Sequence, residues 1–277
     1  MMPKLARVDP LFYDRQLHAA MIVRLKRNPV ANEFAAPLLE AQGAVTIDIR
    51  GEADYPAIKE AWANYSRDGK TFVLNRDAVN ADFQELNSQH AGDPSWKPIA
   101  PIASGQPLDP RQVALMADRY MPIVVHEVGG HARNYKELAQ ILGAPAPNVR
   151  ETEIDALWLE AMTVAAERKI NPGYLKDEAP YAVAAGGLVT KYWEAKQRQD
   201  PGVFRDFIDG VPGYHKIASA FDQGKAAAMP AVAAYYKQDL QRLNVEDLEI
   251  VGNSLPSDEE GAARRNPMHD EPRSMRR

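Results

Sequence analysis

The chain has 277 residues, which is long enough to bury a core as one large domain or as two lobes. Its composition, 45% hydrophobic and 26% charged, is that of an ordinary globular protein. The net charge of -5 argues against a nucleic-acid partner, and the absence of cysteine excludes disulfides and thiolate metal ligands or nucleophiles.

The N-terminal stretch and the apolar runs bear on membrane association. Residues 1–27 are charged throughout and lack the apolar core of a secretory signal. No apolar run approaches the eighteen or so residues that a membrane span requires. We therefore expect a cytoplasmic protein, or one exported without a cleaved signal peptide, with no membrane partner.

The first third of the sequence predicts helices around a small sheet. Helical spacing of apolar residues predicts short helices over 11–27, 32–41, 56–65 and 78–88. Two short runs of β-branched and other apolar residues predict strands over 45–49 and 71–74. The stretch 91–108 is rich in proline and glycine, so we expect an ordered loop there.

The rest of the sequence predicts mostly helix. A capping-box pattern at Asp109 begins one helix, Pro122 kinks it, and Gly143 ends the helical pattern. Asn148 is expected to cap a helix over 149–170. Further helices are expected over 180–198, 203–209, 213–222 and 227–243.

These elements predict an α+β fold that is mostly helical, with a small N-terminal β-sheet. We expect an N-terminal arm over 1–10, a single domain over 11–253 and a disordered tail over 254–277. Within the domain, 11–147 would hold the sheet and the helix of the candidate site, and 148–253 would be helical.

The stretch from His126 to His131 brings two imidazoles and the carboxylate of Glu127 together. The usual zinc-binding helix places its histidines four residues apart. Here they are five apart, and on a regular helix they would point about 140° away from each other. A π-bulge accommodated at Gly129 and Gly130 would bring them onto one face.

The two glycines also admit a second interpretation. Each glycine in a helix interior costs about 1 kcal/mol, so an adjacent pair can simply break the helix. His126 would then be a capping or core residue, and Glu127 a solvated side chain.

A third ligand is expected on the helix over 149–170. Glu151 lies twenty residues after His131, and Asp155 follows one turn later. Both lie beside the apolar stripe of that helix, and a carboxylate directed toward a core needs a partner, which a metal can supply. We predict Glu151 as the ligand and Asp155 as the acceptor for a ligand imidazole. The alternative for Glu151 is a capping-box role three residues after Asn148.

Three other glutamates on the same helix are assigned to solvent. Glu153, Glu160 and Glu167 repeat every seven residues on a face away from the apolar stripe. This spacing separates Glu151 from Glu153 and favours Glu151 as the ligand.

The pattern resembles the gluzincins, which are zinc metallopeptidases with a glutamate as third ligand. His126-Glu127-Val128-Gly129-Gly130-His131 is similar to the extended His-Glu-x-x-Gly-His motif of the dipeptidyl peptidase III family. The resemblance covers about thirty residues, 126–155. The chain is much shorter than members of that family, and its third-ligand spacing follows the general gluzincin pattern.

The resemblance implies a zincin-like fold and the hydrolysis of peptide bonds with Zn2+ as cofactor. His126, His131 and Glu151 would be the zinc ligands, and Glu127 the base that deprotonates a zinc-bound water.

The resemblance also implies where a substrate would bind. A peptide or protein substrate would add as a strand beside the active helix, and Thr71–Leu74 is the candidate strand. Tyr214 or His215 would stabilise the oxyanion, with a surface turn as the alternative interpretation of this pair.

Two other functions compete with peptidase activity. One is a catalytically inactive zincin-like binding or interaction protein, and the other is a helical interaction protein without a metal. We expect no role for the remaining histidines, His18, His90 and His269. The sequence predicts neither the cleavage specificity nor the oligomeric state.

Overall fold

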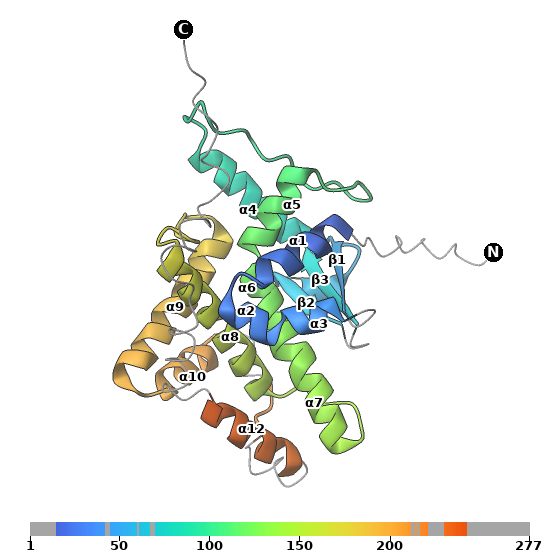
Figure 1. The fold of residues 1–277 in the computed structure, drawn as a ribbon, viewed down its shortest axis with the longest axis vertical. Helices are drawn as coiled ribbons and strands as arrows, with labels where there is room; N and C mark the ends of the chain where they lie inside the picture. The colour runs from blue at the N-terminus through green and yellow to red at the C-terminus, as the bar shows by residue number, and fades with distance from the viewer. Residues whose placement is uncertain are drawn as a thin grey trace, which may run out of the picture.

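The computed structural model describes residues 15–242, except 42–44, 60, 67–69, 212–213, 215–216 and 221–229. It is a mostly helical α+β structure with a small sheet in its N-terminal part, as predicted (Figure 1). The expected N-terminal arm and disordered tail, together with His215 and His269, lie outside the described residues.

The sheet has three strands in the order β1-β3-β2. Strand β3 (Thr71–Asn75) pairs in parallel with β1 (Thr46–Arg50) and antiparallel with β2 (Ala63–Tyr65). Because both edges of β3 are already hydrogen-bonded, the prediction that Thr71–Leu74 offers a free edge to a peptide is wrong. Strand β2 packs against the stretch containing the two histidines.

The helix predicted over 56–65 is also wrong. In its place the chain forms a 3-10 turn, η1 (Pro56–Ile58), followed by β2. Ile58 and Tyr65 are buried, as their apolar spacing indicated, but Tyr65 is buried as part of a strand. Pairing with β3 therefore outweighs the local helical pattern.

The remaining N-terminal helices and the loop agree closely with those predicted from the sequence. The predicted helix over 32–41 is divided at Ala35, just before Pro37. The helices before the loop are α1 (Arg15–Leu25), α2 (Pro29–Phe34), α3 (Ala36–Glu40) and α4 (Arg76–Gln89). The predicted ordered loop is held by amide side chains of α4: Asn80 Oδ1 accepts from Ile102 N at 2.7 Å, and Asn87 Oδ1 from Ile99 N at 2.8 Å.

The central helices surround the histidine motif. Helix α5 (Pro110–Arg119) begins with the predicted capping box at Asp109. Helix α6 (Met121–Val124) leads into η2 (Val125–Ala132), which is a π-helix, and then into α7 (Arg133–Leu142). Gly143 ends α7 in the left-handed conformation, with φ of 64°, as the sequence predicts.

The C-terminal half is helical, with two departures from expectation. Its helices are α8 (Arg150–Ile170), α9 (Pro180–Arg198), α10 (Gly202–Asp209) and α12 (Pro230–Arg242). The N-cap of α8 is Val149, without a side-chain cap, rather than Asn148. Residues 217–220, part of the predicted helix over 213–222, are not helical.

Helix α8 lies inside the molecule, with other helices packed around it (Figure 1). It contacts η2, α9, α2 and α6. The prediction that Glu153, Glu160 and Glu167 face solvent is therefore wrong: the latter two are buried, and the Glu153 side chain is only 14% exposed. Glu167 accepts hydrogen bonds from both terminal nitrogens of Arg24, at 3.0 and 2.6 Å.

The glycine pair in η2 permits close packing against neighbouring helices. A Cβ atom on Gly130 would lie 2.5 Å from the Cβ and 2.7 Å from the Cα of Ala156 in α8. A Cβ on Gly129 would lie 3.2 Å from the Cβ of Phe34 in α2. Gly130 is thus required by the contact between η2 and α8, whereas Gly129 is only closely packed.

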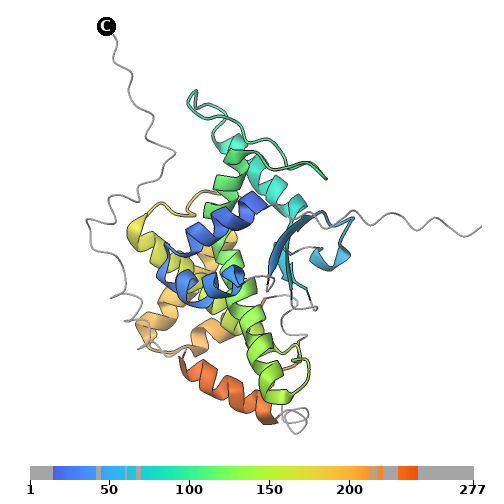
Figure 2. The same cartoon turned by 45° about the vertical axis from the view of Figure 1, so that its right-hand side comes forward.

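The main apolar core draws residues from α1 to α10, so it joins the sheet-bearing and helical parts of the chain. A smaller cluster of Leu138, Val149, Ala220, Val232 and Tyr236 lies where α12 packs near the end of α7 (Figure 2). No helix in the described part of the chain is long and apolar enough to cross a membrane.

We expect Gly130→Ala to destabilise the protein by about 1–3 kcal/mol, because its Cβ would overlap Ala156. Gly129→Ala is the matched control. It gains about 1 kcal/mol of helix propensity and meets a milder contact, so its free energy of unfolding should change less. Urea unfolding measures both. Equal losses for the two variants would contradict the proposed close packing of Gly130.

Candidate metal centre

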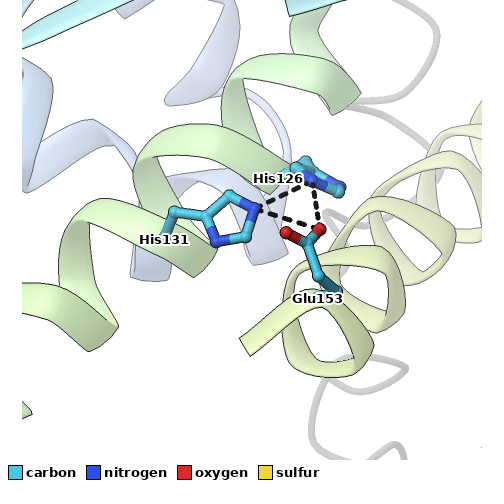
Figure 3. A group of neighbouring side chains, drawn as sticks. All are labelled: His126, His131 and Glu153. Carbon is cyan, nitrogen blue, oxygen red and sulfur yellow. Dashed lines mark hydrogen bonds and ion pairs between the residues drawn. The ribbon is translucent and has the colours of Figure 1, made fainter. Parts of the chain in front are cut away.

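The π-helix η2 places the two motif histidines on the same side. Hydrogen bonds in a π-helix run between residues five apart, which is the spacing of His126 and His131. Their Nε2 atoms lie 3.2 Å from each other, and both rings point toward α8 (Figure 3). The predicted distortion is present, and it extends over the eight residues of η2 rather than one bulged residue.

Glu153 completes a group of three potential ligands (Figure 3). Its Oε2 lies 3.4 Å from His131 Nε2 and 3.8 Å from His126 Nε2. Ligands bound at about 2.1 Å to a tetrahedral zinc ion lie about 3.4 Å from one another. The centre of the circle through the three atoms is about 2.0 Å from each of them. This group could therefore hold a metal ion.

Glu151, the predicted third ligand, lies elsewhere. Its Oε1 accepts a hydrogen bond from Ser219 Oγ at 2.5 Å, and its Oε2 accepts one from Ala220 N at 2.8 Å. It anchors Ser219 and Ala220. The prediction that Glu151 binds the metal is thus wrong, and its capping-box alternative fails too because α8 has no side-chain cap.

The contact between η2 and α8 explains this exchange. Ala156 meets Gly130, so the side of α8 that faces the histidines is the side of Ala156. Glu153 lies three residues before Ala156, close to the same side of the helix. Glu151 lies two residues before Glu153, which turns it about 200° around the helix from Glu153. A small residue opposite the glycine pair, with Glu at -3 and +4, is the sequence signal that could have identified Glu153 and Glu160.

Asp155, predicted to support a ligand imidazole, instead binds the start of α7. Its Oδ2 accepts from Arg133 Nη2 at 2.5 Å and from Asn134 Nδ2 at 2.7 Å. The supporting carboxylate is Glu160, which sequence reasoning missed: its Oε2 lies 3.1 Å from His126 Nδ1. When Nε2 binds a metal, Nδ1 carries the proton and donates to such a carboxylate.

The two histidines are held in different ways. His126 has Glu160, whereas His131 Nδ1 is buried with no hydrogen-bond partner in the described part of the chain. The His131 ring instead stacks on Tyr135, with ring centroids 5.8 Å apart and planes inclined by 22°. Tyr135 in turn contacts Tyr65 of β2, so this aromatic contact links the site to the sheet.

The site is a buried group of carboxylates and imidazoles. Burial raises the pKa of Glu127, and the neighbouring imidazoles offset only part of that effect. Burial lowers the pKa of His126, but Glu160 and the charges of Glu127 and Glu153 outweigh it and raise that pKa to about 9. Burial also raises the pKa of Glu153, and the two histidines more than reverse this, leaving it lowered. The same negative field favours a divalent cation.

The charges of this group act on Tyr214. Burial raises its pKa above the ordinary value, and the charges of Glu153, Glu160 and Glu127 raise it further. Its side chain is half-buried and packs against the main core, in contrast to a turn residue that projects into solvent.

The other described histidines have contacts away from the site. His18 Nε2 lies 3.1 Å from Leu39 O, and His90 stacks on Trp96. Comparisons of the chain with protein-family models, curated proteins and solved structures found no match.

We expect the purified protein to bind one equivalent of zinc. Losing a group that only supports a ligand typically lowers metal affinity by about 10–100-fold. His126→Ala and Glu153→Gln each remove a ligand, so each should lower zinc affinity by more than that. Glu151→Gln is the matched control, since Glu151 is a nearby buried glutamate of α8 whose oxygens bind Ser219 and Ala220.

Metal analysis and chelator competition measure these affinities. Retention of zinc by Glu153→Gln, together with its loss from Glu151→Gln, would restore Glu151 as the ligand.

Proposed function

We propose that the protein is a zinc-dependent metallopeptidase. Its zinc ligands would be His126, His131 and Glu153, and Glu127 would be the general base. The observation that carries this proposal is the triangle formed by the two histidine Nε2 atoms and Glu153 Oε2, with separations of 3.2, 3.4 and 3.8 Å. The buried carboxylate of Glu127 belongs to the same π-helix as the two histidines. The cofactor remains the Zn2+ expected from the sequence.

The position of Glu127 supports its role. It follows the first histidine directly, is buried, and interacts electrostatically with both His126 and His131. A carboxylate with a raised pKa is better suited to exchange protons near neutral pH. Glu127 would take the proton of the attacking water and later transfer it to the leaving nitrogen. A zinc ion held by these ligands would lower the pKa of a water molecule and polarise the scissile carbonyl.

Tyr214 is proposed as the donor that stabilises the oxyanion. A raised pKa keeps its hydroxyl protonated at neutral pH, so it can donate a hydrogen bond as negative charge develops. The effect of the Glu153 and Glu127 charges on its pKa supports this role. The sequence offered both Tyr214 and His215 as candidates for it.

A peptide substrate is supported by the position of β2. Strand β2 is the terminal strand in the order β1-β3-β2, and it packs against η2. A peptide in extended conformation would lie along β2, beside the metal group. Ala63–Tyr65 thus replaces Thr71–Leu74 as the proposed binding strand.

We expect Glu127→Gln to retain zinc and to lose peptide hydrolysis by about 10²–10⁴-fold, the usual contribution of a general base. A peptide library with mass-spectrometric detection of products measures the hydrolysis, and metal analysis confirms the site. A wild-type protein that binds zinc but cleaves no peptide would be an inactive zincin-like binding protein instead. A wild-type protein that binds no zinc would overturn both.

We expect Tyr214→Phe to lower kcat by about 10²–10³-fold, as the loss of one oxyanion donor does, with little change in KM. Steady-state kinetics on the best library peptide test this. Tyr192→Phe serves as the control, because Tyr192 is buried against Trp158 and is not part of the proposed site. A change confined to KM would exclude a role for Tyr214 in the transition state.

A further inference from the structure

A buried chain of hydrogen bonds leads away from the metal centre. Beyond the contact of His126 Nδ1 with Glu160 Oε2, the other oxygen of Glu160 accepts from the Tyr181 hydroxyl at 3.1 Å. Tyr181 and Glu160 are both buried. Each carboxylate oxygen of Glu160 therefore has its own partner, and the two contacts together fix the plane of the carboxylate.

Tyr181 is also held at its backbone. It is the second residue of α9, where amide groups have no acceptor within the helix. The N-cap residue, Ala179, supplies no side-chain acceptor. Asp82 of α4 supplies the missing acceptor: one of its oxygens accepts a hydrogen bond from Tyr181 N at 3.0 Å. A carboxylate from a distant helix thus caps α9 at the residue that reaches Glu160.

Asp82 is itself fixed by several donors. It is fully buried and accepts from the Tyr120 hydroxyl at 2.8 Å and from the guanidinium of Arg119. Arg119 also donates to both oxygens of Asp177, at 2.7 and 2.8 Å. Asp177 in turn accepts from Ala179 N at 3.0 Å, beside the start of α9. This network joins α4, α5 and α9 and gives Tyr181 a rigid base.

We propose that Tyr181 is a positioning residue for the metal centre: with its amide anchored on Asp82, its hydroxyl orients Glu160 toward His126. The terminal torsion of a glutamate has a broad, two-fold preference, so one contact alone leaves the carboxylate free to turn. The inference rests on the proposed zinc site. It concerns His126 specifically. His131 stacks on Tyr135, and among the described residues no carboxylate hydrogen-bonds its Nδ1.

The variant Tyr181→Phe tests this role with little risk to the fold. The Tyr181 ring packs against Trp62 and Tyr120, with centroids 5.3 and 5.5 Å away, and Phe keeps both contacts. The backbone amide on Asp82 is also unchanged. Tyr192→Phe is the matched control, because it removes a hydroxyl from another buried ring of the same helix.

We expect Tyr181→Phe to weaken zinc affinity by about tenfold, within the range for supporting groups, and to shift the visible spectrum of the cobalt-substituted protein. Tyr192→Phe should match the wild type. In the Glu160→Gln background, Tyr181→Phe should have little further effect, since it acts through Glu160. A purely structural role would change stability without moving the cobalt spectrum, and its effects would add to those of Glu160→Gln.

The outcomes separate this inference from the proposed function. If the wild type binds zinc and Tyr181→Phe binds it equally well, or if the two variants are additive, only the role of Tyr181 is overturned. If the wild type binds neither zinc nor cobalt, the zinc site fails, and the positioning role fails with it.

Discussion

The close contact between η2 and α8 is the constraint on which the rest of the site depends. At Gly130 and Ala156 the two helices approach so closely that no side chain beyond hydrogen fits on the η2 side. This contact selects the face of α8 that the histidines meet, and so selects Glu153 and Glu160 from the acidic residues of that helix. The π-helix alone would align the imidazoles without deciding which carboxylate they meet.

Glu153, Glu160 and Glu167 form a line of acidic side chains along α8, largely removed from solvent, and its stability has one physical explanation. A carboxylate removed from water is tolerated only with partners that replace its hydration. Glu167 has Arg24 and Asn28, and Glu160 has His126 and Tyr181. In the part of the chain that the structure describes, the ion-pair partners of Glu153 are the two imidazole groups. It is therefore the member of the line whose environment most favours a cation.

Much of this arrangement was accessible from the sequence, and the failures share a cause. The capping box at Asp109, the left-handed Gly143 and the need for a π distortion all depend on residues close in sequence. The identity of the third ligand depends on how α8 is rotated against η2, which is a tertiary contact. The seven-residue spacing of the glutamates predicted one solvated face on α8, but other helices pack around α8 and cover that face. Strand β2 escaped prediction because its pairing with β3, a contact between two elements, outweighs the helical spacing of apolar residues over 56–65.

The five-residue spacing of the histidines and the π-helix compensate for each other. A π-helix closes its hydrogen bonds five residues apart, where a regular helix closes them four apart, so both imidazoles share a face despite the additional residue. The same compensation keeps α7 in phase with the helix before η2. Arg133 and Asn134 therefore reach Asp155, and Tyr235 of α12 bonds to Asn134 and Glu137. The additional residue is thus absorbed within η2, and the contacts of α7 and α12 constrain the backbone of η2 as much as the two histidines do.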